Sequence, residues 1–253
     1  MKKVILLIIC FLLTGQAFAA ETIIAVAANF TDAMRNIVPL FEQSTGHSVK
    51  VSFGSTGKLF SQIENGAPFD VFLAADTKRP SKAEEKMLAV KGTRFTYARG
   101  KLVLWSAIPG LFNDGEAYLK KGDFKRIAIA NPKTAPYGLA AQQVLEYLSI
   151  WNVLQRKLVR GDSIAQTFQF TATRNAEIGF VALSQAKSWR GKPGSFWEIP
   201  ESGYAPIAQQ AVLLKKGEKN TAAKAFLEFL KEAKAQAVIA RLGYGVENSI
   251  IGE

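Results

Sequence analysis

Residues Phe53-Gly54-Ser55-Thr56-Gly57-Lys58-Leu59-Phe60 connect a predicted strand, 47–53, to a predicted helix that runs to about residue 65. A strand that ends in small residues and turns directly into a helix leaves free backbone N–H groups at the positive end of the helix dipole, where anions bind. Ser55 and Thr56 stand at the position of a helix cap, and the two glycines let a ligand approach the backbone closely. The stretch alone therefore fits both an anion site and an ordinary helix cap.

Two further strand-then-helix units flank this stretch. The apolar strand 22–28 ends at Asn29, which we expect to cap the next helix, and the strand 69–74 is followed by Asp76, a second predicted cap. Three such units in succession predict a mostly parallel sheet with helices on both faces. Ligands of such sheets bind at the carboxyl ends of the strands, so Asn29 and the Ser55-Thr56 pair are expected to face one crevice.

The same alternation restarts after residue 100 and predicts a second lobe. We expect an α/β fold of two lobes, each a mostly parallel sheet flanked by helices. Lobe 1 is predicted to consist of 20–100 plus 207–253, and lobe 2 of 101–206. The segment 189–205, which contains prolines and glycines, is expected to be an irregular connection, and the last two helices should pack on lobe 1.

Residues 1–19 have the three parts of a secretory signal peptide: a basic start, an apolar run over 4–13, and small residues before a cleavage point after Ala19. The apolar run is too short to span a membrane. Its removal also removes Cys10 and leaves 253 − 19 = 234 residues without cysteine. We therefore expect an exported protein whose stability comes from a hydrophobic core and not from disulfides.

The chain is basic, with a formal net charge of +11, or about +9 without Lys2 and Lys3. Such a balance suits a nucleic acid or a small anion as partner. The basic residues are scattered among acidic ones and show no aromatic stacking pattern, so we expect no nucleic-acid partner. A basic surface still raises the rate at which small anions are encountered.

Few residues could carry catalysis. After residue 19 there is no cysteine and a single histidine, His47, at the start of a predicted strand, which leaves no Cys-His pair and no histidine metal site. Asp70 and Asp76 could form a carboxylate pair, or serve Ser55 as a base in a secreted hydrolase. A strand-entry role for Asp70 and a cap role for Asp76 explain them more simply, so we expect a binding protein and not an enzyme.

Two turns of the second lobe add neutral hydrogen-bond donors. The turn 134–138 precedes a helix and offers backbone N–H groups and the hydroxyl of Tyr137. The turn 160–164 precedes another helix, with Ser163 as the expected cap and Ile164 offering only its backbone N–H. Together with the two turns of lobe 1, they describe a cleft that holds an anion by hydrogen bonds from both sides, without a counter-charge.

The order and spacing of five motifs resemble the periplasmic molybdate-binding proteins of ABC transporters, the ModA type, over nearly the whole chain after residue 19. The motifs are A-V-A-A-N-F at 25–30, S-F-G-S-T-G-K-L at 52–59, A-P-F-D-V-F-L-A-A-D at 67–76, N-P-K-T-A-P-Y-G at 131–138 and R-G-D-S-I-A-Q at 160–166. The resemblance implies a type II periplasmic-binding-protein fold with the ligand in the cleft between the lobes. It also implies a periplasmic location, molybdate or tungstate as ligand without a cofactor, and an inner-membrane ABC permease as partner of a monomer.

The resemblance also implies which residues bind the oxyanion: Asn29, Ser55 or Thr56, Tyr137 and Ile164. It implies no direct protein ligand to the molybdenum atom. Spacing from Asn29 favours Thr56 as the direct ligand, while composition leaves Ser55 open. One position departs from the pattern, because many relatives carry a tyrosine donor where this chain has Ala182. Tyr137 could replace that donor.

The expected donor set also bears on selectivity among oxyanions. A fully deprotonated tetrahedral dianion needs hydrogen-bond donors alone, so phosphate, which still carries a proton at neutral pH, should be disfavoured. Sulfate has the same charge and acceptors as molybdate, and cavity size must separate the two. Another small oxyanion such as sulfate therefore remains the alternative ligand.

Overall fold

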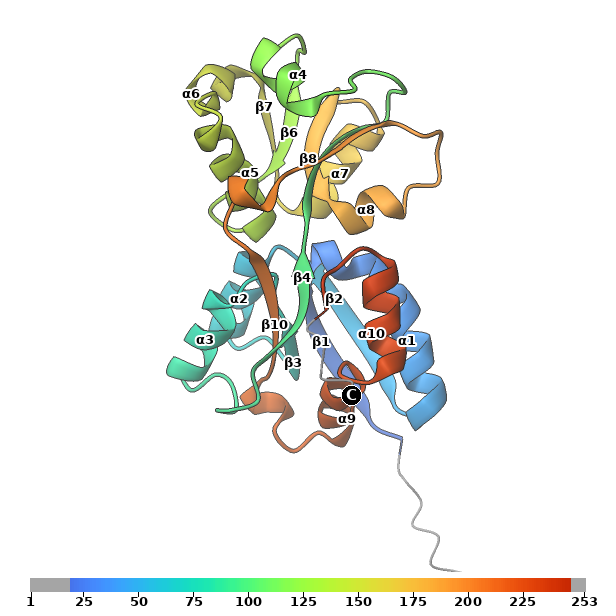
Figure 1. Ribbon diagram of the computed structural model, residues 1–253. Coiled ribbons are helices and arrows are strands. Elements are labelled where there is room, and N and C mark those ends of the chain that lie inside the picture. Colours follow the sequence, from blue (N-terminus) through green and yellow to red (C-terminus); the bar gives the residue numbers. More distant parts are fainter. Residues whose placement is uncertain (1–18, 247–253) are drawn as a thin grey trace, which may run out of the picture.

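The computed structural model describes residues 19–246, which form two lobes, each built on a five-stranded sheet (Figure 1). β1 (Glu21–Ala27) lies inside the first sheet, and its side chains alternate between two covered faces. Ile24 and Val26 pack into one core, while Ala25 packs into another on the opposite face. A strand buried on both faces explains the unbroken apolar sequence of this segment.

The first sheet has the strand order β2-β1-β3-β10-β4. The further strands are β2 (Ser48–Gly54), β3 (Val71–Leu73), β4 (Phe95–Gly100) and β10 (Ile207–Leu213). β1 pairs in parallel with β2 and β3, whereas β10 runs antiparallel to both of its neighbours. The sheet is therefore mixed, with β10 alone running against the other four strands.

Helices cover both faces of this sheet. They are α1 (Thr31–Thr45), α9 (Thr221–Phe229) and α10 (Ala233–Arg241) on one face, and α2 (Thr56–Glu64) and α3 (Lys78–Glu85) on the other. The two last helices thus belong to the same core as β1, as their amphipathic sequence predicts. α1 tolerates Pro39 in its interior and ends at Gly46, which adopts a left-handed conformation (φ 70°).

The second sheet has the strand order β7-β6-β8-β5-β9. Its strands are β5 (Leu102–Ser106), β6 (Ile127–Ala130), β7 (Leu158–Gly161), β8 (Ile178–Ala182) and β9 (Ser195–Glu198). β6, β7 and β8 are parallel, and β5 is antiparallel to β8 and β9. Its helices are α4 (Gly115–Lys121), α5 (Pro136–Tyr147), α6 (Trp151–Leu154), α7 (Ile164–Ala172) and α8 (Leu183–Lys187).

The chain passes between the two sheets twice, once from β4 to β5 and once from β9 to β10. The strands of the first sheet fall within 20–100 and 207–253, and those of the second within 101–206, although the division into these two domains stays a prediction. At the first crossing, a Cβ atom added to Gly100 would lie 2.1 Å from the Tyr137 hydroxyl oxygen. Glycine is therefore needed there, because the tyrosine fills the space beside the crossing strand.

Several sequence predictions need correction. Asn29 does not cap α1: a 3-10 turn, η3 (Ala28–Phe30), comes first and Phe30 is the N-cap residue, without a side-chain hydrogen bond. The segment 189–205 is not wholly irregular, since it contains β9 and the 3-10 turn Glu201–Gly203. β4, α6 and α8 were not predicted, because they are short or carry mixed apolar and basic residues. The signal peptide lies almost entirely outside the described residues, and within 19–246 no helix is long and apolar enough to cross a membrane.

Aromatic packing in the core of lobe 1 provides a test of this architecture. Phe41 of α1 is fully buried and meets Phe226 and Phe229 of α9 edge-to-face, with ring centroids 5.2 and 5.6 Å apart. We expect Phe41→Ala to lower the free energy of unfolding by about 3–5 kcal/mol, because it leaves a cavity between two helices. Urea unfolding measures this. The matched control is Phe53→Ala, since Phe53 is 44% exposed, and an equal loss in both variants would contradict the packing described.

Candidate functional site

The predicted ligand residues of both lobes surround one cavity. It is small, with a cavity volume of about 10 Å³. Its lining comprises Ala27, Ala28, Asn29, Gly54, Ser55, Thr56, Ala75, Ala135, Pro136, Tyr137 and Ile164. All five residues named from the sequence are present, and they come from the carboxyl ends of β1 and β2 in one lobe and from the starts of α5 and α7 in the other. Their role in binding stays a prediction.

Ser55 and Thr56 form the start of α2. Ser55 is the N-cap residue, but its hydroxyl makes no cap hydrogen bond, and Ser55 Oγ is buried without any partner among residues 19–246. Thr56 Oγ1 accepts a hydrogen bond from the backbone N–H of Ala75 (3.1 Å), so the hydroxyl proton remains available for donation. A buried hydroxyl without a partner is costly and rare. The turn therefore lacks a hydrogen-bond acceptor at this point.

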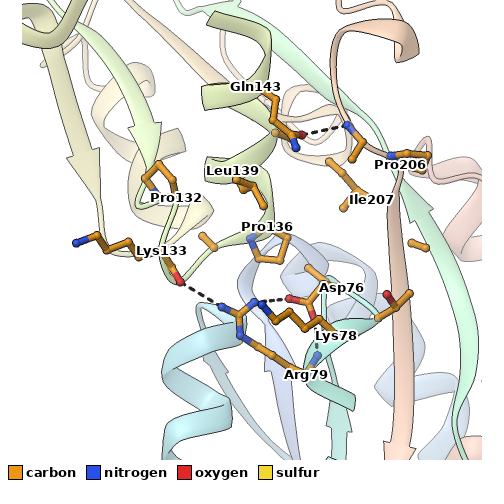
Figure 2. Close-up of a pocket in the computed structure, with 16 residues that line it drawn as sticks. Asp76, Lys78, Arg79, Pro132, Lys133, Pro136, Leu139, Gln143, Pro206 and Ile207 are labelled. Atoms are coloured by element: carbon orange, nitrogen blue, oxygen red, sulfur yellow. Dashed lines mark hydrogen bonds and ion pairs between the residues drawn. The ribbon is translucent and has the colours of Figure 1, made fainter. Parts of the chain in front are cut away.

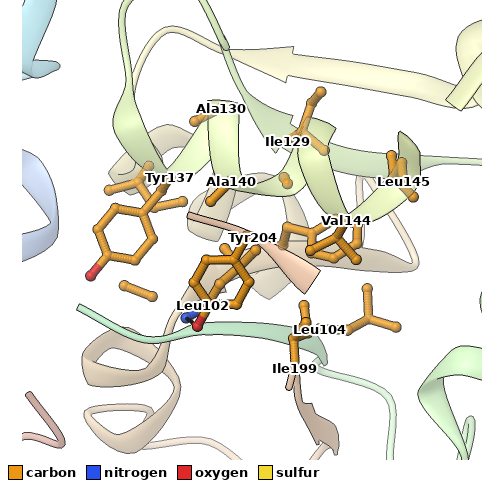
Figure 3. Packing of buried hydrophobic residues seen from close by; sticks show 14 of the residues in the cluster. Leu102, Leu104, Ile129, Ala130, Tyr137, Ala140, Val144, Leu145, Ile199 and Tyr204 are labelled. Carbon is orange, nitrogen blue, oxygen red and sulfur yellow. Dashed lines mark hydrogen bonds between the residues drawn. The ribbon is translucent and has the colours of Figure 1, made fainter. Parts of the chain in front are cut away.

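Tyr137 occupies the second position of α5, directly after Pro136. The N–H groups of the first helical turn have no intrahelical acceptor, and the proline at the first position has no N–H, so the backbone N–H of Tyr137 is the first available donor. The hydroxyl lies elsewhere: it accepts a hydrogen bond from Gln209 Nε2 (3.4 Å) and rests against Gly100, and neither residue lines the cavity. Figure 3 shows the ring at the edge of the lobe 2 core, near Tyr204 and Ala140.

Ile164 occupies the first position of α7. Ser163 caps this helix by accepting from the N–H of Gln166, as the sequence predicted. That bond leaves the N–H groups of Ile164 and Ala165 without an intrahelical partner. The carbonyl of Ile164 accepts from Gln185 Nε2 (3.2 Å), which fixes the peptide beside the cavity.

Asn29 lies in the η3 turn, and its side chain points into a buried network. Asn29 Nδ2 donates to Gln209 Oε1 (2.7 Å) and to the Tyr244 hydroxyl (3.3 Å). Its carbonyl accepts from the Tyr244 hydroxyl (2.6 Å) and the Ser184 hydroxyl (3.3 Å). Since both amide protons are used, the donor that Asn29 can offer toward the cavity is its backbone N–H in the first turn.

No charged side chain lines the cavity. Lys58, in the first turn of α2, pairs with Asp162 of the other lobe (2.7 Å), and Arg79 pairs with Asp76. The positive potential in the cavity comes instead from the starts of helices in both lobes, whose N–H groups carry partial positive charge. A small anion is thus favoured without a formal counter-charge.

Hydrogen bonds close the cleft beside the cavity. The N–H of Gly57 donates to the Thr134 carbonyl (2.8 Å), and Arg79 donates to the Lys133 carbonyl (3.2 Å). A Cβ atom on Gly57 would lie 3.0 Å from the Thr134 backbone, so glycine permits this close approach. A groove outside the cavity shares Ala75, Ala135 and Pro136 with it. The groove is also lined by Asp76, Arg79 and other residues of both lobes (Figure 2).

Apart from Ser55, the residues considered for catalysis do not line the cavity. His47 Nδ1 accepts from the backbone N–H of Ala20 (3.1 Å). Asp70 accepts from Thr22, Ile23 and Asn220, and Asp76 accepts from the N–H of Arg79 near the start of α3. Neither carboxylate bonds to Ser55. Within 19–246 no group of three or more His, Cys, Asp or Glu residues could hold a metal ion.

Sequence reasoning missed Gln209, Tyr244 and Ser184, which hold Asn29 in place. The sequence contains a sign of the role of Gln209. Two glutamines interrupt the apolar strand 207–213, and a buried amide requires hydrogen-bond partners. Tyr244 carries no such signal, since its position is set by the fold of the last helices. Ala182 ends β8, and its N–H donates to Gln185 Oε1 (3.1 Å). No residue of β8 or α8 lines the cavity.

Burial raises the pKa of five tyrosine hydroxyls above the usual value of about 10. The shift is largest for Tyr97, Tyr137 and Tyr244 and smaller for Tyr118 and Tyr204. Loss of solvation is the main cause for each, and the Tyr244 hydroxyl adds a smaller upward effect on Tyr97 and Tyr137. These hydroxyls therefore remain protonated donors and acceptors throughout the neutral and moderately alkaline range.

Comparison with known proteins gives the family. Residues 23–245 match the family described as "Bacterial extracellular solute-binding protein". The chain is 56% identical over 237 residues to "Molybdate-binding protein ModA" of Azotobacter vinelandii, covering 93% of this chain and 94% of the relative. It is 51% identical over 231 residues to the protein of the same name from Rhodobacter capsulatus, covering 91% and 90%. The chain belongs to the bacterial extracellular solute-binding proteins, among those of the ModA type.

A solved structure agrees with this assignment. The Azotobacter vinelandii periplasmic molybdate-binding protein superposes with a TM-score of 0.86 at 42% identity, covering 90% of this chain and 100% of that one. A sulfate-binding protein of Mycobacterium tuberculosis superposes with a TM-score of 0.76 at 14% identity, which shows a shared fold alone. The predicted two-lobed periplasmic-binding-protein fold is thereby confirmed.

The unpartnered Ser55 hydroxyl leads to a prediction on stability without ligand. Ser55→Ala removes a buried group that has no hydrogen bond, so the free energy of unfolding should stay level or rise by up to about 1 kcal/mol. The matched control is Ser163→Ala, which removes a helix cap and should cost about 1 kcal/mol. Urea unfolding of both ligand-free variants measures the difference, and a comparable loss in Ser55→Ala would show that its hydroxyl is satisfied.

The buried tyrosines lead to a prediction on alkaline stability. Their folded-state pKa values exceed the unfolded value, so the folded protein binds more protons above about pH 10 and stability falls as the pH rises further. Each such group lowers the free energy of unfolding by up to about 1.4 kcal/mol for every further pH unit. Absorbance of phenolate during an alkaline titration should show at least three of the six tyrosines, Tyr97, Tyr137 and Tyr244, ionising only together with unfolding. Ionisation of all six before unfolding would contradict the network described.

Proposed function

We propose that this protein captures molybdate, and tungstate with it, in the cleft between its lobes and delivers the oxyanion to an inner-membrane ABC permease. The observation that carries the proposal is the buried Ser55 hydroxyl without a partner, at the wall of a cavity lined by neutral donors from both lobes. An oxyanion oxygen would supply the missing acceptor. The names of the relatives from Azotobacter vinelandii and Rhodobacter capsulatus support molybdate as that oxyanion.

The chemistry of the cavity matches a fully deprotonated tetrahedral dianion. Such a ligand carries acceptors only, and the cavity offers donors without a carboxylate. Hydrogen phosphate would need an acceptor for its proton, so it should bind more weakly. Sulfate presents the same acceptors on a smaller ion, and discrimination against it depends on how closely the donors can approach.

Each predicted residue has a distinct role in the proposal. Asn29, Tyr137 and Ile164 donate their backbone N–H groups from the starts of three helices, and Ser55 and Thr56 donate their hydroxyls. In this proposal both hydroxyls act on the ligand, whereas the sequence left the choice between Ser55 and Thr56 open. The molybdenum atom has no direct protein ligand, because every contact goes through an oxygen of the oxyanion.

Release and delivery require the cleft to open. Donors from both lobes surround the cavity, and the bonds from Gly57 to Thr134 and from Lys58 to Asp162 connect the lobes beside it. A ligand that binds both lobes stabilises the closed form by its differential affinity for that form. We propose a periplasmic monomer that presents the closed, loaded form to the permease, after cleavage of the signal peptide near Ala19, and that leaves its ligand chemically unchanged.

Thermal and calorimetric titration tests the proposal. Molybdate and tungstate at about a hundred times the dissociation constant should each raise stability by about 2.7 kcal/mol. Phosphate should have no effect, and sulfate a smaller one at the same concentration. An unchanged melting temperature with molybdate and tungstate would overturn the proposal, and a larger shift with sulfate would establish the alternative ligand.

Variants that lack the hydroxyl of Ser55 or Thr56, titrated with molybdate in the same way, test where the anion binds. Ser55→Ala and Thr56→Val each remove one bond to a charged ligand, so each should weaken molybdate binding by about 1.5–3 kcal/mol, that is, roughly 10–150-fold. Thr56→Ser keeps the hydroxyl and is the control for Thr56→Val. If the alanine and valine variants bind as tightly as the wild-type protein, the anion binds somewhere else.

A further inference from the structure

Gln209 is a completely buried amide at the point where the chain returns to lobe 1. Its strand, β10, has an irregular register against β4 between Gln209 and Gln210. Because of this irregularity, the side chains of Gln209 and Gln210 have different surroundings. Gln210 meets Thr96 and Arg94, which are partly exposed, whereas Gln209 points toward the base of the oxyanion cavity.

The amide of Gln209 binds residues of both lobes. Its Oε1 accepts from Asn29 Nδ2 (2.7 Å) and from the Tyr97 hydroxyl (3.1 Å), both in lobe 1. Its Nε2 donates to the Tyr137 hydroxyl (3.4 Å) in lobe 2. An amide is suited to this position because it presents an acceptor on one side and a donor on the other.

Two of these partners carry proposed ligand donors at their backbone. The Asn29 side chain anchors the η3 turn, and the Tyr137 side chain anchors the start of α5, while Gln209 itself does not line the cavity. We propose that Gln209 is a positioning residue for the oxyanion site, which holds the Asn29 turn and the Tyr137 turn in their binding geometry across the two lobes. This inference rests on the proposed function and adds a residue to that site.

The surrounding packing leaves the amide little freedom. A Cβ atom on Gly100 would lie 2.8 Å from Gln209 Nε2, and the Tyr97 hydroxyl also donates to the Ala74 carbonyl (3.2 Å). The bond to Tyr137 forms when the second lobe lies against the first, whereas the bonds to Asn29 and Tyr97 stay within lobe 1. Gln209 therefore stabilises the closed arrangement and fixes the relative position of the two turns. Loss of its amide should accelerate ligand dissociation more than it slows association.

The experiment compares two neighbouring glutamines on one strand. Gln209→Met keeps the length of the side chain and removes the amide, and Gln210→Met is the matched control outside the network. We expect Gln209→Met to weaken molybdate binding by about ten-fold or more, mainly through faster dissociation in stopped-flow measurements. Gln210→Met should stay within about two-fold of the wild-type protein. Thermal unfolding of both ligand-free variants confirms that they are folded.

A second variant covers the case in which Gln209→Met does not fold. Gln209→Glu keeps an acceptor for Asn29 and Tyr97 and can accept from Tyr137, but its carboxylate becomes negative as the pH rises and then repels the oxyanion. Its affinity for molybdate should fall by about ten-fold or more as the introduced carboxylate ionises, while the wild-type affinity stays nearly constant over the same pH range. A purely structural role would not produce this pH dependence.

The outcomes separate this inference from the proposed function. If the wild-type protein binds molybdate and a folded Gln209→Met binds equally well, Gln209 is not a positioning residue and the proposed function stands. Binding of molybdate by Gln209→Glu that equals that of the wild-type protein at every pH leads to the same conclusion. If the wild-type protein binds neither molybdate nor tungstate, the proposed function fails and the inference fails with it.

Discussion

The backbone N–H groups at the starts of helices are the constraint on which this structure depends. A helix cannot satisfy its first N–H groups by itself, so each start needs a cap, a partner or a ligand. α7 has a cap in Ser163, but α2 has an N-cap serine whose hydroxyl has no hydrogen-bond partner within residues 19–246. Four such starts lie around one cavity, and the proposed anion site is formed from their groups, which carry no net charge.

The neutral character of the cavity has consequences for the rest of the molecule. Two ion pairs lie near the cleft: Lys58 with Asp162, which connects the lobes, and Arg79 with Asp76, which lies within lobe 1. A buried counter-charge would bind a dianion more strongly but would carry a high desolvation cost in the open form. Donors that are fixed by the fold avoid that cost, because they are oriented before the ligand arrives.

The orientation of the turns at Asn29 and Tyr137 depends on a buried polar network next to the cavity. Asn29, Tyr137 and Tyr244 reach one another through Gln209 and through Ser184, and each hydroxyl or amide in this group has a partner. Satisfied networks of this kind rigidify their surroundings, whereas a single missing partner is costly. The geometry of the turns at Asn29 and Tyr137 therefore depends on Gln209, Tyr244 and Ser184, which come from distant parts of the chain and do not line the cavity.

Local sequence patterns predict the two α/β lobes, the approximate positions where the chain crosses between them, and the turns at 55–56, 137 and 164 that line the cavity, because apolar periodicity and turn residues act over short distances. Local patterns do not predict β4 and β9, which form strands because they pair with distant segments. They also predict the wrong role for Asn29, which is not the N-cap of α1. Tertiary structure decided that the Asn29 side chain and the Tyr137 hydroxyl bond to Gln209, 180 and 72 residues away. Such contacts depend on how distant segments of the chain pack together, and local sequence patterns do not predict that packing.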